Sequence, residues 1–165
     1  MFREMLVLLV LPVLMPETVV AAEFGMKVPM QEKGAVTYYV PAHFDAGMGA
    51  DLMVDTGSGY LVINEGTLAA LKEKGRAEYV KKVSGTMADG SKTTVPIYRI
   101  ASLSIGCCCL VQDVEAAVFP GSTRQILGLS ALRKVAPFAL SMEPPRLMLS
   151  NCETGVKAGS TAASF

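Results

Sequence analysis

The sequence predicts a mostly β domain, a small barrel or sandwich, with one or two short helices. Six or more short runs of β-branched, aliphatic and aromatic residues are separated by turn residues about every ten positions. The chain has 165 residues, which is the length of a single domain with one core and leaves no room for a second lobe. With 51% hydrophobic and 18% charged residues, it is too apolar to be intrinsically disordered.

Residues 1–22 have the pattern of a signal peptide. Arg3 precedes an uncharged run over Met5–Pro16, and Val20–Ala22 supplies the small residues that a signal peptidase accepts. A run of 12 residues is shorter than the roughly 20 apolar residues that span a bilayer. We therefore expect cleavage near Glu23 and a periplasmic or secreted protein without a stable membrane span. An uncleaved N-terminal anchor is the alternative.

The first half of the expected domain, which runs over residues 23–152, holds a hairpin, a short strand and a helix. Val36–Phe44 is aromatic and β-branched, and Asp45–Gly49 is rich in turn residues. The apolar run Asp51–Asp55 is therefore expected to form a hairpin with the first strand. Tyr60–Asn64 is predicted to be extended, and Thr67–Lys74 to be a helix that ends at the following glycine.

The second half is predicted to be largely strands. The stretch Lys72–Lys82 alternates in charge and predicts a solvated helix face and loop. Val83–Ala88 and Ser91–Ile97 flank an Asp-Gly pair, which strongly favours a β-hairpin. Residues 153–165 are small and polar and predict a disordered tail. The other elements expected here are strands at Ile100–Ile105, Cys109–Phe119, Phe138–Met142 and Arg146–Leu149, and a short helix at Ser130–Val135.

Charge and cysteine content exclude two classes of site. The 15 basic and 15 acidic residues give zero net charge, which argues against a nucleic-acid partner. Cys107, Cys108 and Cys109 are adjacent, so on a strand they cannot all face one metal ion, and no metal or other cofactor is expected. Two interpretations of the cysteines remain open. They are buried apolar residues, or Cys152 forms a disulfide with one of the three.

One motif indicates chemistry. Asp55-Thr56-Gly57-Ser58 directly follows an apolar strand, which is an unusual place for a carboxylate unless it only opens a turn. With the Asp-Gly hairpin and the later Ile126-Leu127-Gly128, which a short helix follows, this segment resembles the retropepsin-like, single-domain aspartic proteases, including exported bacterial forms. The resemblance covers roughly residues 37–149. It implies a single-lobe acid-protease barrel.

The resemblance also implies a role for each motif residue. Asp55 would be the catalytic carboxylate, Thr56 would join two such loops across a dimer, and Ser58 would hydrogen-bond the Asp55 carboxylate. Gly57 would let the substrate pass close to the loop. The remaining implied residues are a supporting element at Ile126, Leu127 and Gly128 and a substrate-covering flap at Met87, Ala88, Asp89 and Gly90.

The chemistry implied by the resemblance needs two carboxylates that share one proton, one activating a water molecule and the other polarising the peptide carbonyl. This chain has one such motif, so the resemblance implies a homodimer in which two copies of Asp55 meet. The expected function is endopeptidase cleavage of extended peptide or protein substrates.

The main alternative is a catalytically inactive peptide-binding module of the same fold in the cell envelope. A Ser or Cys hydrolase would need a histidine base, and His43, the one histidine of the sequence, lies in a strand-like run. Val54–Gly59 also resembles the phosphate loop of actin-fold kinases. That fold has two large domains, which this chain is too short to form.

Overall fold

The computed structural model describes residues 24–45, 47–86 and 90–154. The expected signal peptide and the hairpin residues Met87, Ala88 and Asp89 lie outside the described residues. The elements in chain order are β1 (Met26–Pro29), β2 (Gln31–Lys33), β3 (Thr37–Phe44), β4 (Met48–Val54), β5 (Leu61–Asn64), α1 (Glu65–Glu73), β6 (Ala77–Thr86), β7 (Lys92–Ile105), β8 (Cys109–Phe119), β9 (Ile126–Leu127), α2 (Leu129–Leu132), the 3₁₀ turn η1 (Arg133–Val135), β10 (Phe138–Met142), β11 (Pro145–Leu149) and β12 (Glu153–Thr154). The expected mostly β fold with two short α-helices is confirmed.

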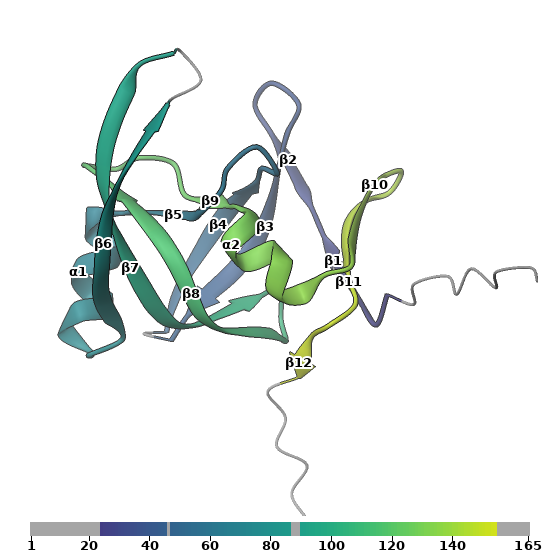
Figure 1. The fold of residues 1–165 in the computed structure, drawn as a ribbon. Coiled ribbons are helices and arrows are strands. Elements are labelled where there is room, and N and C mark those ends of the chain that lie inside the picture. Colours follow the sequence, from purple (N-terminus) through teal and green to yellow (C-terminus); the bar gives the residue numbers. More distant parts are fainter. Residues whose placement is uncertain (1–23, 46, 87–89, 155–165) are drawn as a thin grey trace, which may run out of the picture.

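The main sheet closes on itself as a barrel. Its strands follow the order β8-β5-β9-β4-β3-β7, and β7 pairs again with β8 to complete the circle. The first part of β7 also pairs with β6, and this long hairpin rises above the barrel (Figure 1). Closure leaves an apolar interior, in which Leu52, Leu61 and Leu127 are fully buried.

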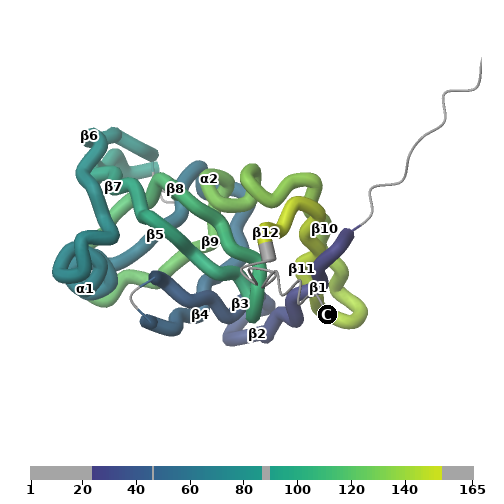
Figure 2. Tube along the Cα trace, turned by 90° about the horizontal axis from the view of Figure 1, so that it is seen from below, coloured from purple at the N-terminus to yellow at the C-terminus, as the bar shows by residue number. Residues whose placement is uncertain are grey.

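A second, smaller sheet lies beside the barrel. It has the order β1-β11-β10, so the strand near the start of the described chain pairs with the hairpin near its end. Figures 1 and 2 place this sheet at one end of the molecule and α1 at the other. The face that carries Leu147 and Leu149 packs into the main core.

The long hairpin starts earlier than the sequence predicted. Ala77–Lys82, expected as part of a solvated helix face and loop, instead forms the first half of β6. A register shift between Tyr79 and Lys81 breaks the alternation of the strand, so the partly buried residues are Ala77, Val80 and Val83. The expectation rested on alternating charge, which is as compatible with the exposed side of a strand as with a solvated helix face, and it was wrong for this part of the stretch.

Strand β7 is also longer than predicted. Ser91–Ile97 and Ile100–Ile105 were expected as two strands. Apart from Ser91, they belong to one 14-residue strand that pairs with β6, β8 and β3 along its length. Strands β1 and β2 were not predicted at all. They hold few β-branched residues, and their partners β11 and β3 are distant in sequence or separated from them by an irregular turn.

The cysteines form two disulfides. Cys109 is bonded to Cys152 over a separation of 43 residues, which is one of the two open alternatives, and Cys107 is bonded to Cys108. The longer loop contributes about 4 kcal/mol by the chain-entropy estimate. It holds β12, formed by two residues that were expected in the tail, against the start of β8.

Within the described residues, no helix has the length and apolar character needed to cross a membrane.

Candidate functional site

The candidate site is the loop between β4 and β5. Strand β4 ends at Val54, and main-chain bonds fix the next residue, Asp55. Its N–H donates to the Leu127 carbonyl oxygen at 3.2 Å, and its carbonyl oxygen accepts from the Ser58 N–H at 3.3 Å. The Asp55 carboxylate accepts a hydrogen bond from the Gly57 N–H, with a distance of 2.8 Å to Oδ1. The loop therefore holds the carboxylate in a defined orientation through its own main chain.

Gly57 leaves room for that carboxylate. A Cβ atom built on Gly57 would lie 3.1 Å from Asp55 Oδ1, closer than ordinary contact. A side chain here would push the carboxylate away from the N–H that binds it. The resemblance implied that glycine is needed here so that the substrate can pass close to the loop. The structure adds a second reason for glycine, which is that it leaves room for the Asp55 carboxylate.

Ser58 does not make the expected bond. Its hydroxyl donates to the carbonyl oxygen of Tyr60 at 2.8 Å, so in this structure its hydrogen is not directed to the Asp55 carboxylate. The expectation was wrong because the loop turns back on itself after Gly57, which brings the Tyr60 carbonyl within reach of the hydroxyl. Ser58 therefore stabilises the shape of the loop. Thr56 is exposed at the loop surface.

Strand β9 supports the loop from beneath. It lies between the two strands that flank the loop: Ile126 pairs with Met53 of β4 in parallel and with Val62 of β5 in antiparallel fashion. The main-chain N–H of Leu129 donates to the Ser58 carbonyl oxygen at 2.8 Å. The segment Ile126-Leu127-Gly128 thus contacts both ends of the Asp55 loop.

Gly128 is the point of closest approach. A Cβ atom built there would lie 2.0 Å from the Tyr60 carbonyl oxygen and 2.8 Å from that of Ser58. Both neighbours are main-chain atoms, which cannot rotate away as a flexible side chain can. Any residue larger than glycine would separate this segment from the loop that carries Asp55.

Two supporting residues were missed from the sequence. Ser130 Oγ accepts from the Leu61 N–H at 2.7 Å and donates to the Glu115 carbonyl oxygen at 2.6 Å, so it joins β5 to β8. Thr67, a buried polar residue, donates its hydroxyl to Gln125 Oε1 at 3.0 Å. The available signal was position: Ser130 follows Gly128 by two residues, and Gln125 directly precedes Ile126.

The predicted flap coincides with the end of the β6–β7 hairpin. Strand pairing continues to Thr86 and Lys92, and Gly90 has a φ of +82°, a left-handed conformation that suits glycine in a tight connection. The other three predicted flap residues lie outside the described residues. In Figure 1 the β6–β7 hairpin extends to the same, upper side of the molecule as the loop between β4 and β5.

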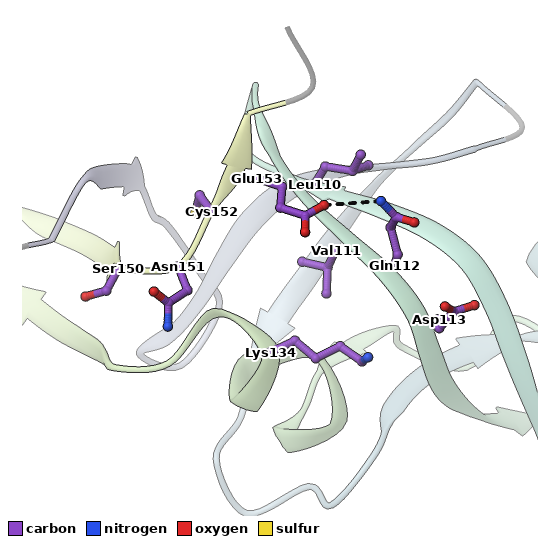
Figure 3. Close-up of a pocket in the computed structure, with 9 residues that line it drawn as sticks. All are labelled: Leu110, Val111, Gln112, Asp113, Lys134, Ser150, Asn151, Cys152 and Glu153. Atoms are coloured by element: carbon purple, nitrogen blue, oxygen red, sulfur yellow. Dashed lines mark hydrogen bonds between the residues drawn. The ribbon is translucent and has the colours of Figure 1, made fainter. Parts of the chain in front are cut away.

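A cavity of about 630 Å³ lies elsewhere, between β8, η1 and the C-terminal segment (Figure 3). Its rim is polar: Gln112 donates to Glu153 at 3.2 Å, and the side chains of Asp113 and Lys134 face the same space. No residue of the Asp55 loop or its supporting segment lines it. We favour the loop as the candidate site because the Asp55 carboxylate is held there by main-chain groups and by a separate supporting segment.

No group of three or more His, Cys, Asp or Glu side chains among residues 24–45, 47–86 and 90–154 is arranged to hold a metal ion.

Comparison with known proteins gives two matches. The family model described as "gag-polyprotein putative aspartyl protease" matches residues 42–134, more than half of the chain. Among solved structures, a retropepsin-like aspartic protease from Rickettsia conorii is similar, with a TM-score of 0.52 and 17% sequence identity. That similarity covers 75% of this chain and 87% of the Rickettsia chain. No curated protein sequence matches this one.

Proposed function

From its place in the retropepsin-like aspartyl protease family, to which the chain belongs, we propose that the protein is an aspartic endopeptidase with Asp55 as its catalytic residue. The main observation behind the proposal is that separate hydrogen bonds hold the side chain and the main chain of one aspartate. The Gly57 N–H binds its oxygen, and Leu127 binds its main chain. A turn that merely needed an aspartate would not require the separate β9 segment and the main-chain contact at Gly128.

The active form is a homodimer. One ionised carboxylate is a poor catalyst of amide hydrolysis, whereas two adjacent carboxylates share one proton. The ionised carboxylate takes a proton from a water molecule, whose oxygen attacks the peptide carbonyl carbon. The protonated carboxylate donates a hydrogen bond to the carbonyl oxygen, and the leaving nitrogen accepts a proton as its bond to carbon breaks. A shared proton is best preserved under mildly acidic conditions, where we expect activity.

The free edge of β10 supports a second copy as the partner. In the described sheet β10 pairs with β11 alone, so one row of its main-chain groups has no strand partner. Its segment Phe138–Met142 carries no charge, and Leu140 and Met142 are 41% and 46% exposed. Edge strands in monomers are normally protected by charged residues, bulges or coverage. An uncharged apolar edge fits antiparallel pairing with the same strand of another copy.

The apolar face at this edge is continuous with the core. Leu140 lies opposite Leu147, which is fully buried. Pairing of two β10 strands about a two-fold axis would join the two small sheets and cover both exposed side chains. Figure 1 shows the β10–β11 hairpin and the β6–β7 hairpin extending to the same side of the molecule. We propose that a partner paired at β10 brings its own copy of Asp55 to this side of the molecule.

The substrate is an extended peptide or an unfolded segment of a protein. Main-chain hydrogen bonds along an added strand give affinity independent of sequence, and side-chain pockets give selectivity. The end of the β6–β7 hairpin, with Met87, Ala88, Asp89 and Gly90, would cover the bound strand and exclude water.

We also propose export, with cleavage after residue 22. The support is the N-terminal sequence pattern together with the Cys109–Cys152 disulfide, because such bonds persist in oxidising compartments.

The experiment is cleavage of an unfolded protein substrate by residues 23–165 from pH 3 to 8, beside Asp55→Asn, with the oligomeric state measured in the same samples. We expect turnover in the wild type, loss of turnover in the variant, and unchanged melting of the variant. No cleavage in a dimeric wild-type sample, with peptide binding that survives Asp55→Asn, would favour an inactive peptide-binding module. Activity that rises steadily to pH 9 would contradict the shared-proton mechanism.

A further inference from the structure

The four cysteines form one accessible and one shielded disulfide. The Cys107–Cys108 bond lies in the turn between β7 and β8, where Cys107 is exposed and Cys108 is partly exposed. Cys109, the first residue of β8, is fully buried and bonded to Cys152. The turn lies at the end of β7 opposite to the β6–β7 hairpin (Figure 1). It is thus remote along the strand from the proposed peptide-binding side.

The stability of the fold gives no reason for the accessible bond. A disulfide stabilises a protein mainly by closing a loop in the unfolded chain, and the effect grows with the length of that loop. The Cys109–Cys152 bond closes a loop with a separation of 43 residues. The Cys107–Cys108 bond joins neighbours, with a separation of 1, so it restricts almost nothing beyond its own ring. What it offers instead is chemical reactivity at the surface.

The turn beneath this bond is firmly held. The N–H of Gly106 donates to the Pro41 carbonyl oxygen at 2.7 Å, and Gly106 has a φ of +64°. A Cβ atom built on Gly106 would lie 3.0 Å from both terminal methyl groups of Val28. Ile105 and Cys109 pair directly below the turn. The disulfide is therefore presented to solvent on a fixed support.

We propose that Cys107–Cys108 is a thiol–disulfide exchange site that accepts two electrons from a dithiol. A thiolate of the dithiol attacks the exposed Cys107 Sγ, forms a mixed disulfide and breaks the bond to Cys108, whose thiolate takes up a proton. The second thiol of the dithiol, as its thiolate, attacks the mixed disulfide. This releases the Cys107 thiolate, which is protonated, and leaves the dithiol as a disulfide. Sulfur atoms, protons and both electrons balance.

The exchange leaves the shielded bond and the fold in place. Attack requires an approach to a disulfide sulfur. Cys109 is fully buried and its partner Cys152 is partly buried, so a thiolate reaches this bond less readily than the bond that ends at the exposed Cys107. Opening Cys107–Cys108 frees no loop, so the β7–β8 hairpin and the Asp55 loop keep their positions. The site is independent of the proposed protease activity.

The experiment is a titration of the folded, oxidised protein with dithiothreitol, followed by iodoacetamide and mass mapping of the cysteine peptides. We expect Cys107 and Cys108 to be alkylated at dithiol concentrations at least about tenfold below those that open Cys109–Cys152. A second arm replaces dithiothreitol with a thioredoxin-type dithiol protein, which separates access by small molecules from access by a folded partner. In either arm, labelling of Cys107 and Cys108 before Cys109 and Cys152 supports the proposal.

Paired variants keep the outcome interpretable. The double variant Cys107→Ser/Cys108→Ser should melt within about 2 °C of the wild type, and Cys109→Ser/Cys152→Ser should melt at least about 5 °C lower. Simultaneous opening of both bonds, or labelling of Cys107 and Cys108 only after unfolding, would overturn the proposal. If Cys107→Ser/Cys108→Ser lowers the melting temperature as much as Cys109→Ser/Cys152→Ser does, the accessible bond is structural.

Discussion

At the scale of single residues, Gly128 sets the distance between β9 and the Asp55 loop. The Cβ atom of Gly128→Ala would lie 2.0 Å from the Tyr60 carbonyl oxygen, so the main chain must move. We expect a loss of about 3 kcal/mol or more in the free energy of unfolding. Gly59→Ala is the matched control, because nothing lies within 4 Å of its Cβ position. Chemical denaturation measures both, and equal stabilities would contradict the contact.

The hydroxyl of Ser130 is the second residue-scale test. It accepts from Leu61 and donates to Glu115, so Ser130→Ala leaves a part-buried N–H and a carbonyl oxygen without these bonds. We expect it to cost about 1–3 kcal/mol. Ser150 offers the control, since its buried hydroxyl has no hydrogen-bond partner among the described residues. Ser150→Ala should be neutral or stabilising in the same denaturation measurement. A smaller loss for Ser130→Ala than for Ser150→Ala would refute this account.

At the scale of elements, the free edge of β10 is where assembly can be tested. The double variant Leu140→Lys/Met142→Lys places two charges on the edge that we propose to pair with a second copy. Like charges facing each other across the two-fold axis oppose pairing, so we expect a shift from dimer to monomer of at least about tenfold in Kd and a parallel loss of turnover. Sedimentation and cleavage assays measure the two effects.

The control for this edge is another exposed apolar side chain. Tyr79, which is 53% exposed, belongs to β6. This strand contacts α1 and lies at the opposite end of the molecule from β10 (Figures 1 and 2). Tyr79→Lys should leave the dimer fraction unchanged. A dimer that survives both lysines at β10 would place the interface elsewhere and would leave the role of Asp55 untouched.

Elements with simple patterns were predictable from the sequence. Val36–Phe44 differs from β3 by one residue, and the Asp-Gly pair correctly marked a hairpin. The alternating charge of β6 concealed the start of that strand. Strand β9 has two residues, too few for any period, and its motif identified it where a hydrophobic pattern could not.

For the candidate site too, some features were predictable from the sequence and others were not. A short motif predicted that Asp55 and Gly57 lie in one loop and that Gly128 lies in the segment that supports it, because these positions depend on the main chain, which the motif encodes. The partner of the Ser58 hydroxyl and the bridge made by Ser130 depend on how the loop turns and on which strands meet behind it. Such contacts between residues distant in sequence follow from the fold, so the local sequence could not supply them.

At the scale of the whole molecule, the barrel supplies half of a catalytic site, and mixed assemblies test this directly. Wild type and Asp55→Asn are co-expressed with different tags, and total protein is held well above the dimerisation constant. If both carboxylates are needed, a heterodimer is inactive, and activity follows the square of the wild-type fraction. An equal mixture should then retain about one quarter of the wild-type activity. A value of about one half would mean that each subunit works alone, because activity would then follow the wild-type fraction itself.

Since Asp55→Asn removes one charge at a partly exposed loop and keeps the shape of the side chain, the variant should assemble as the wild type does. Mass measurement of the purified heterodimer checks that condition, and an active heterodimer would refute the two-carboxylate mechanism while leaving the fold and the β10 interface standing.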